Sequence, residues 1–363
     1  MKVLVAGDSF KGSLTAFEFT ETVAKVLRSH GAECRVLALS DGGEGSLEIL
    51  TKLFDGRIEK TVASNALLNP VTVKTGITDK ACFIESAQAI GLPQLKGNTD
   101  ICRTSSYGVG EMIAFAVKHN LNDIVLTLGG TTSDDGGAGM LCALGARFSD
   151  GQSDFIPTSG TLCRIKSCDL TPAIRLLEHT RVTVLSDVKN PLLGSNGATY
   201  VYAPQKGATA DLLPFLEKSM EHYANIVNSH THTDRTACPG AGAGGGLGFA
   251  CMQLPHVTFL QGSNAILDMV NFDGLVKQCD WIITGEGKFD KQSYMGKIVG
   301  NVINRSKGKN IAVICGVADE EMYNDKNIKL LREIGKNKPD SLTNAKKYLT
   351  EETEKLFPLL SGC

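Results

Sequence analysis

The sequence predicts an α/β protein of two domains, in which the two chain ends together build one domain with a parallel sheet. The first observation is an alternation of short apolar strands, glycine-containing loops and amphipathic segments near the N-terminus, which is typical of parallel sheets covered by helices. The second is the return of this alternation in the C-terminal third. The third is a central region that differs from both ends, with hydroxyl-rich, strand-like stretches. The predicted domains are 1–62 with 265–363, and an inserted domain at 63–264.

The N-terminal elements follow from the spacing of apolar residues. Residues 2–7 (KVLVAG) form a predicted strand, and the segment after it carries apolar side chains at a helical spacing. Ser13 is the predicted N-cap of this helix, and Gly31 is the predicted stop after its last turn. The next predicted strand and helix are ECRVLAL at 33–39 and SLEILTKLF at 46–54.

The same criteria place the later elements. Strand-like stretches occupy 60–85, and RVTVLSD at 181–187 is a further strand, with helices predicted at 107–119 and 211–228. The C-terminal third supplies a strand, a helix and a buried strand, namely DWIITGEG at 280–287, KIVGNVINRSKG at 297–308 and NIAVICG at 310–316.

Composition excludes several classes of protein. The chain has 37 basic and 39 acidic residues without a block of like charge, which disfavours a nucleic-acid partner. Its 11 cysteines are scattered without a CxxC motif, so we expect no zinc site or disulfide framework, and a reducing cytoplasm. No apolar stretch is long enough to span a bilayer, so no membrane partner is expected. Glycine accounts for 39 of the 363 residues, a larger share than the roughly 7% usual in proteins. This excess favours loops whose backbone contacts a ligand.

Two glycine-containing loops follow the first two predicted strands. GDSFKGSL at 7–14 places Lys11 before the final glycine, whereas a Walker A motif has its lysine after it. Anion binding is still favoured, because a helix start is a positive pole and Lys11 adds a mobile charge. SDGGEG at 40–45 contains Asp41 and Glu44. Carboxylates at a strand end are suitable ligands for Mg²⁺, which commonly binds one or two carboxylates together with substrate phosphates. The structural alternative for 7–14 is a capped helix with a solvated lysine. The structural alternative for 40–45 is a tight turn with solvated acidic side chains.

Two later loops carry charged residues just after predicted strands. TGEGKFDKQSYMGK at 284–297 contains Glu286 and Asp290, which suit a metal or hydroxyl contact. Its lysines suit phosphate, although surface salt bridging explains each one singly; they are Lys288, Lys291 and Lys297. RVTVLSDVKNPLLGSNGA at 181–198 ends its strand with Asp187, where a rigidly held carboxylate can accept a proton from a substrate hydroxyl. A turn or helix-capping aspartate is the alternative.

Three glycine-rich or hydroxyl-rich segments complete the candidates. RTSSYGVGEMI at 103–113 places Thr104 and Ser105 at a predicted helix start. LTLGGTTSDDGGAGM at 126–140 follows an apolar strand with five glycines, three hydroxyl residues and two adjacent carboxylates. Either it is an ordinary turn, or its backbone approaches a phosphate or a metal. PGAGAGGGLGF at 239–249 has six glycines, which permit either ligand contact or close helix packing.

Together these segments resemble the glycerate kinase family, the bacterial type that phosphorylates glycerate from ATP. The resemblance covers nearly the whole chain in order, through DSFKGSL, LSDGGEG, TSSYGVGE, LGGTTSDDGGAGM, SDVKNPLLGSNGA, PGAGAGGGLG and TGEGKFDKQSYMGK. It implies a Rossmann-like parallel-sheet domain, an inserted α/β domain with a mixed sheet, and an active site in the cleft between them. The chain departs from the family at Gly7, usually proline, at Asp134, usually asparagine, and at Lys288, commonly arginine. The proline usual after the last Gly-Lys pair is also missing at 298–299.

The resemblance implies Mg²⁺-dependent transfer of the ATP γ-phosphate to D-glycerate, with 2-phosphoglycerate as the favoured product. Phosphoryl transfer depends on positioning and charge neutralisation, and the chain offers no serine or cysteine nucleophile set. The expected catalytic residues are Asp187 as general base, Lys11 and Asp135, although Asp135 alternatively fixes its loop. The expected substrate- and phosphate-binding residues are Ser9, Ser13, Asp41, Thr104, Ser105, Thr131, Thr132, Ser133, Asn190, Lys288 and Lys297. The expected metal ligands are Glu44, Glu286 and Asp290.

Two other functions fit the same residues. A kinase of another small hydroxy acid or sugar acid would use the same chemistry and differ only in pocket shape. A non-catalytic anion-sensing protein is disfavoured, because a sensor has no need of the proton acceptor at Asp187. The sequence does not decide between a monomer and a homo-oligomer.

Overall fold

The computed structural model describes residues 1–43, 45–95, 100–336 and 338–362 of the chain. These divide into two compact units, of which unit 1 comprises Met1–Asp41 with Gln261–Cys363 and unit 2 comprises Gly42–Leu260. The expected boundaries were 62 and 265. Residues 42–62 lie in unit 2 because the helix α2 (Ser46–Leu53) packs on strands of the unit 2 sheet.

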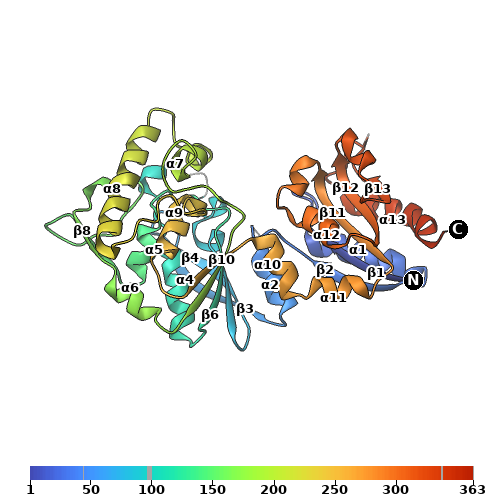
Figure 1. Ribbon diagram of the computed structural model, residues 1–363, viewed down its shortest axis with the longest axis horizontal. Helices are drawn as coiled ribbons and strands as arrows, with labels where there is room; N and C mark the ends of the chain where they lie inside the picture. The colour runs from blue at the N-terminus through green and yellow to red at the C-terminus, as the bar shows by residue number, and fades with distance from the viewer. Residues whose placement is uncertain (44, 96–99, 337, 363) are drawn as a thin grey trace. The chain divides into compact units, whose positions relative to one another are not determined.

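Unit 1 contains a five-stranded parallel sheet in the order β13-β12-β11-β1-β2 (Figure 1). Its strands are β1 (Lys2–Gly7), β2 (Glu33–Ala38), β11 (Trp281–Phe289), β12 (Asn310–Ala318) and β13 (Leu330–Glu333). Its helices are α1 (Ala16–Ser29), α10 (Gly262–Met269), α11 (Phe272–Lys277), α12 (Ile298–Arg305) and α13 (Ala345–Ser361). The predicted Rossmann-like parallel-sheet domain is therefore confirmed.

The alternation of side chains along the strands of unit 1 explains its layers. Val3 and Val5 of β1 belong to a buried cluster with Phe19 and Val23 of α1, and α1 packs in turn against α13. The other face of the sheet meets α12, which contacts β11 and β1. Helices thus cover both faces, as in doubly wound α/β folds.

The first helix begins later than the sequence suggested. Thr15 is the N-cap of α1, and its side chain forms a capping box with Glu18, so Ser13 is not the cap. The capping box satisfies two helix-terminal N–H groups reciprocally, which a lone serine at Ser13 cannot do. Ser13 instead donates its hydroxyl to the carbonyl of Phe10 at 3.1 Å. Gly31, with φ +85° just after the last turn, fits its predicted role as a stop.

Unit 2 contains a six-stranded sheet in the order β10-β9-β6-β5-β4-β3. Its parallel part joins β5, β6, β9 and β10, while β3, β4 and β5 pair antiparallel, which confirms the predicted mixed sheet. The six strands are β3 (Arg57–Ser64), β4 (Pro70–Ile77), β5 (Ala81–Glu85), β6 (Asp123–Thr127), β9 (Arg181–Leu185) and β10 (Val257–Leu260). A separate two-stranded sheet pairs β7 (Arg147–Ser149) with β8 (Ser167–Asp169).

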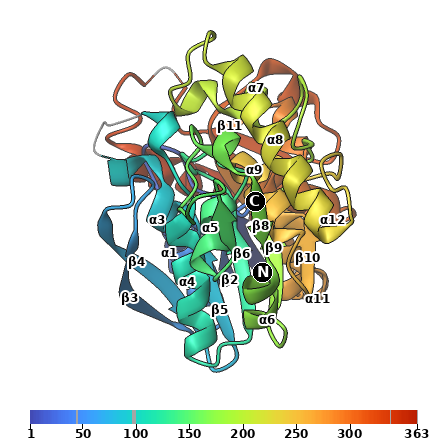
Figure 2. The same cartoon turned by 90° about the vertical axis from the view of Figure 1, so that its left-hand side faces the viewer.

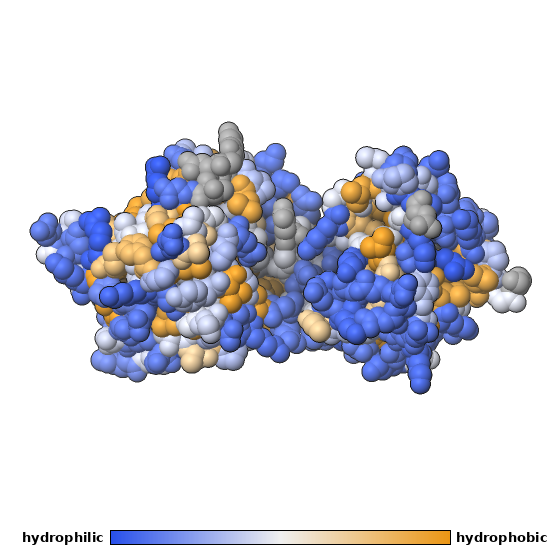
Figure 3. All heavy atoms as spheres, turned by 90° about the horizontal axis from the view of Figure 1, so that it is seen from above, coloured by the Kyte–Doolittle hydropathy of each residue, from blue (hydrophilic) through white to orange (hydrophobic). Residues whose placement is uncertain are grey.

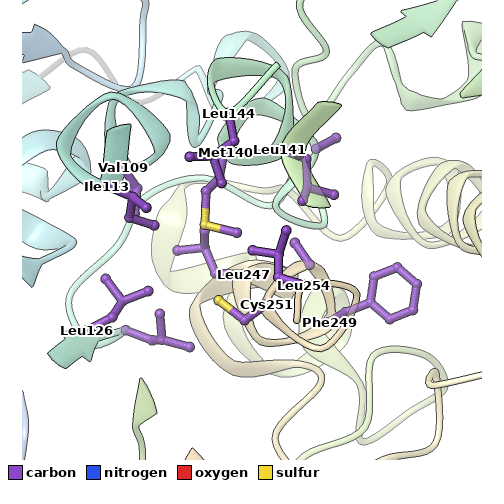
Figure 4. Close-up of a cluster of buried hydrophobic side chains, with 14 of the residues drawn as sticks. Val109, Ile113, Leu126, Met140, Leu141, Leu144, Leu247, Phe249, Cys251 and Leu254 are labelled. Atoms are coloured by element: carbon purple, nitrogen blue, oxygen red, sulfur yellow. The ribbon is translucent and has the colours of Figure 1, made fainter. Parts of the chain in front are cut away.

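Helices cover the unit 2 sheet, and several lie in front of its strands in Figure 2. They are α3 (Ala87–Ile90), α4 (Tyr107–Lys118), α5 (Ala138–Ala143), α6 (Thr171–Leu176), α7 (Ala198–Tyr202), α8 (Leu213–Thr231) and α9 (Ala243–Cys251). The core lies between β6 and the helices α4, α5 and α9, where Leu126, Ile113, Met140 and Leu247 converge (Figure 4).

No helix within the described ranges has both the length and the apolar character needed to cross a membrane. The face shown in Figure 3 is mostly hydrophilic and carries apolar side chains only in patches.

Candidate active site

A pocket of about 360 Å³ lies at the carboxyl ends of the unit 1 strands. The order of the strands reverses beside β1. From β1 the chain passes through α1 to β2 on one side of it, whereas β11, β12 and β13 lie on its other side. Ligands of open α/β sheets bind at such a switch point, beyond the carboxyl ends of the strands. Seven of the expected site residues line this pocket: Ser9, Lys11, Ser13, Asp41, Glu286, Lys288 and Lys297.

A larger cavity of about 790 Å³ lies in unit 2, at the amino ends of β6, β9 and β10. Its rim carries the exposed ion pair of Arg181 with Asp123, whose N–O distance is 2.6 Å. None of the expected site residues lines this cavity. The pocket of unit 1 is smaller, but it lies at the carboxyl ends of its strands and contains expected site residues. We therefore assign the function to the pocket of unit 1.

Asp8 is a pocket residue that the sequence analysis missed. It follows the last residue of β1, its N–H donates to the carbonyl of Gly285 at 3.0 Å, and its carboxylate accepts the N–H of Ser9 at 2.6 Å. Burial, with a further contribution from the charges of Asp41 and Glu286, raises the pKa of Asp8 to about 7. The signal was present, because Asp8 ends a buried strand as Asp187 does.

Glu286 lies inside β11 and is only 6% exposed. Its Oε1 has no hydrogen-bond partner among the described residues, and its Oε2 is 3.8 Å from Nζ of Lys297. Burial raises the pKa of Glu286, opposed in part by a hydrogen bond with the Ser293 side chain and by the charge of Lys297. A buried carboxylate oxygen without a donor is costly, so this oxygen is suited to a metal or a ligand hydroxyl.

Asp290 and Lys288 have partners within the protein. Asp290 caps the short turn Lys291–Tyr294, accepting the N–H of Gln292 at 2.8 Å. Lys288 is exposed and lies 3.1 Å from Asp290 and 3.4 Å from Asp319. Asp290 is therefore a cap rather than a free metal ligand, and Lys288 matches the alternative of surface salt bridging.

The expected metal set of three carboxylates is not assembled in the described residues. Glu44 lies outside them, and no group of three or more His, Cys, Asp or Glu side chains within them is close enough to hold an ion directly. Mg²⁺ often takes only one or two carboxylates and completes its shell with water and phosphate. Glu286, with its unpartnered oxygen, fits such a site.

In unit 2, Asp135 is a structural anchor of the loop after β6. Its side chain is fully buried, and Oδ2 accepts the N–H and the hydroxyl of Ser106 at 2.7 and 2.8 Å. The N–H groups of Gly137 and Gly139 donate to the two oxygens at 3.2 and 3.1 Å. These bonds tie the loop to the starts of α4 and α5. These contacts support the alternative role of Asp135, which is to fix the loop.

Three of the expected substrate hydroxyls serve the fold in the same way. Thr104, Ser105 and Thr132 are buried and donate to backbone carbonyls at 2.7, 2.8 and 2.7 Å. Because each donor is used within the protein, these residues shape the loop rather than contact a ligand directly. The hydroxyl cluster had suggested ligand binding, but buried threonine and serine satisfy backbone acceptors equally well.

The remaining expected residues of unit 2 differ in exposure. Thr131 and Ser133 are buried, and the hydroxyl of Ser133 has no partner among the described residues. Asn190 donates to the carbonyl of Asn196 at 2.8 Å and accepts from a tyrosine hydroxyl, which folds the loop after β9. Asp187 lies two residues beyond the last residue of β9 and is partly exposed. Strand β9 thus ends before Asp187, and the role of Asp187 as proton acceptor stays a prediction.

A buried lysine beneath this loop was not anticipated from the sequence. Lys206 is 6% exposed, and its Nζ donates to the carbonyl of Ser133 at 2.7 Å. Burial raises the pKa of the adjacent Asp134 to about 6, opposed by Lys206 and by a hydrogen bond from Thr199 at 2.9 Å. Burial also lowers the pKa of Lys206. A lysine in the stretch APQKGA normally indicates a solvated loop, so no sequence signal marked it.

The glycine run at 239–249 packs against the same loop. Gly245 has φ +71°, and a Cβ there would lie 2.0 Å from the carbonyl oxygen of Ser133 and 2.8 Å from Nζ of Lys206. No side chain can be accommodated at that separation. Of the two alternatives for this run, close packing therefore explains Gly245.

Comparisons with known proteins give a consistent result. The family model described as the Glycerate kinase family matches residues 3–361. A glycerate kinase of Bacillus cereus is 38% identical over 86% of this chain and 84% of its own length. A glycerate 2-kinase of Escherichia coli is 34% identical over 88% of this chain and 85% of its own length. A solved structure from Salmonella typhimurium LT2, named as a candidate glycerate kinase 2, superposes with TM-score 0.88 at 30% identity, covering 100% of this chain and 98% of that one.

Proposed function

Since this chain belongs to the glycerate kinase family, we propose that it transfers the γ-phosphate of ATP to a hydroxyl of D-glycerate. The enzyme is a phosphotransferase with an alcohol group as acceptor. The glycerate 2-kinase among its relatives supports 2-phosphoglycerate as the product. ATP as the donor and Mg²⁺ as the metal belong to the proposal.

The unit 1 pocket is the observation that carries this proposal. It combines two cationic side chains, Lys11 and Lys297, with the carboxylates of Asp8, Asp41 and Glu286 at one switch point. Polyphosphate recognition needs cations for the phosphate oxygens and carboxylates for the accompanying metal. Both are present on the carboxyl edge of one rigid parallel sheet.

The pocket also offers an apolar side for a nucleotide base. Val317, Ile334 and Leu342 line it, and Gly287 and Gly316 lie on adjacent strands. A Cβ on Gly316 would lie 2.3 Å from the carbonyl oxygen of Gly287, so the strands present bare backbone there. We infer that the base lies along this apolar side and the phosphates point toward Lys11.

Each charged group has a distinct task in this mechanism. Lys11 is exposed on the loop after β1, so it can follow the transferring phosphoryl group and neutralise its charge. Lys297 precedes α12, whose first N–H groups are a second positive pole. Bound Mg²⁺ would supply further charge neutralisation, and we propose that Glu286 helps to hold it.

Asp187 is the proposed general base for the acceptor. A carboxylate at a strand end has a firmly held backbone, and the N–H of the preceding Ser186 bonds to the carbonyl of Leu260 at 3.0 Å. The Asp187 side chain is partly exposed. We propose that glycerate binds to unit 2 at this position, because the loop after β6 presents exposed backbone at Gly130 on the same carboxyl edge.

A coupled assay of ADP release tests the function. The purified protein is supplied with ATP, Mg²⁺ and either enantiomer of glycerate or a related hydroxy acid, and phosphorus NMR identifies the product. We expect turnover with D-glycerate to give 2-phosphoglycerate and little turnover in excess chelator. If the protein turns over a different hydroxy acid but not glycerate, that acid is the substrate instead. If activity is undiminished in excess chelator, Mg²⁺ is not required.

A further inference from the structure

A half-buried carboxylate, Asp8, follows the end of β1 beside a buried one, Glu286, in the neighbouring strand β11. The strands are parallel neighbours, with Val5 opposite Ile283. The N–H of Asp8 donates to the carbonyl of Gly285 at 3.0 Å, so this pairing continues past the end of β1. Asp8 therefore lies beside the peptide that leads into Glu286. Both side chains line the same pocket.

The protein compensates this pair only in part, through Ser293 and Lys297 at Glu286 and through Ser9 at Asp8. Oε1 of Glu286 is buried and has no hydrogen-bond partner among the described residues. The cation that pairs with Glu286, Nζ of Lys297, is 3.8 Å from the other carboxylate oxygen, which is beyond hydrogen-bond distance. Asp8 accepts one backbone N–H, from Ser9. A half-buried carboxylate beside a buried one is unfavourable unless something else compensates their charge.

A third carboxylate adds to the same field. Asp41 lines the pocket, and its charge acts on both Asp8 and Glu286. The three do not converge closely enough to enclose an ion by themselves. Two carboxylates with open positions for water and phosphate oxygens are instead what Mg²⁺ takes in phosphoryl-transfer sites.

We propose that Asp8 and Glu286 bind one divalent cation of the Mg²⁺ class between the ends of β1 and β11, in a site to which Asp41 adds negative charge. This inference rests on the proposed function in one respect only, namely that a substrate phosphate completes the coordination shell of the cation. It adds Asp8, which was not among the expected metal ligands, and replaces Asp290, which caps its own turn. Asp8 touches the cation directly, so the pair should bind the metal before any substrate is present.

Binding of Mn²⁺ alone tests the site without relying on activity. Electron paramagnetic resonance of free Mn²⁺ is followed as wild-type protein, Asp8→Asn or Glu286→Gln is added. We expect one Mn²⁺ per chain in the wild type and an affinity at least about tenfold lower in each variant, since loss even of an outer-shell partner of a metal ligand typically costs about 10–100-fold. The matched control is Asp273→Asn, which removes an exposed carboxylate of unit 1 that pairs with Arg305 outside the pocket and should leave Mn²⁺ binding unchanged.

The outcomes separate this site from the proposed function. Wild-type affinity in both folded pocket variants, or no Mn²⁺ binding by the wild type at millimolar metal, overturns the site even when the protein phosphorylates glycerate. Loss of Mn²⁺ affinity in both variants, in a protein that does not act on glycerate, keeps the site and removes the function. Circular dichroism establishes that each variant is folded, and Glu286→Gln carries the test should Asp8→Asn fail to fold.

Discussion

Replacing Lys206 by methionine tests whether the buried charges beneath the 131–135 loop stabilise unit 2. Methionine keeps most of the volume of the side chain but removes the ammonium group, whose Nζ donates to the carbonyl of Ser133 at 2.7 Å. Asp134, 1% exposed, then loses the cation that favours its ionised form. Removing one partner of a buried pair leaves an uncompensated charge and costs about 3–5 kcal/mol.

The expected magnitude converts directly into a shift in denaturant midpoint. With an m-value of about 2 kcal/mol per molar urea, the free energy lost corresponds to a midpoint lowered by about 1.5–2.5 M. The matched control is Lys218→Met, which removes an exposed lysine on α8 and should change the free energy of unfolding by less than about 0.5 kcal/mol.

The loss should depend on pH in a defined direction. The folded-state pKa of Asp134, about 6, is above its ordinary value of 3.8, so the group stabilises the fold at low pH and this contribution is lost as the pH rises through 6. Without Lys206 that pKa rises further. The cost of Lys206→Met should therefore be small at pH 5, where Asp134 is already protonated, and largest above pH 7.

The assay combines two spectroscopic probes. Trp281 is the sole tryptophan of the chain and lies in unit 1, so its fluorescence reports that unit, whereas far-UV circular dichroism reports both. We expect the Lys206→Met variant to shift the dichroism transition and leave the fluorescence transition in place. Adding Asp134→Asn should recover part of the loss. A cost below 1 kcal/mol at pH 7.5 with no recovery in the double variant would refute the reasoning.

Three further predictions concern the loops. Gly245→Ala should destabilise unit 2 by several kcal/mol in thermal unfolding, because its Cβ would lie 2.0 Å from the Ser133 carbonyl at φ +71°; an unchanged melting temperature would contradict this packing. Lys11→Ala should lower kcat with unchanged stability, since Lys11 is exposed in the phosphate pocket, and wild-type kinetics would move Lys11 out of that site. Asp187→Asn should lower kcat by about 10²-fold or more with little change in ATP affinity, whereas near-normal kcat would give the proton to another acceptor.

The local sequence pattern determined the layers of this protein. Apolar strands followed by glycine-containing loops and amphipathic helices predict parallel sheets with helices on both faces. The spacing of apolar residues can be read from the sequence because it reflects which face of each helix or strand is buried. Seven of the expected site residues, among them Lys11, Asp41 and Lys297, also line one pocket. They do so because loops at the carboxyl ends of parallel strands necessarily share one edge of the sheet.

Tertiary structure alone decided how deeply each polar side chain of the loops is buried and which groups within the protein it contacts. Asp135 and Asp187 are both aspartates of loops that follow apolar strands, yet Asp135 is fully buried and accepts N–H groups from two helix starts, whereas Asp187 is partly exposed. The burial of Lys206, the crowding at Gly245 and the pairing of Asp8 with Glu286 likewise depend on segments far apart in the chain. Hydrogen-bond satisfaction and desolvation are properties of these long-range contacts, so no local pattern of residues specifies them.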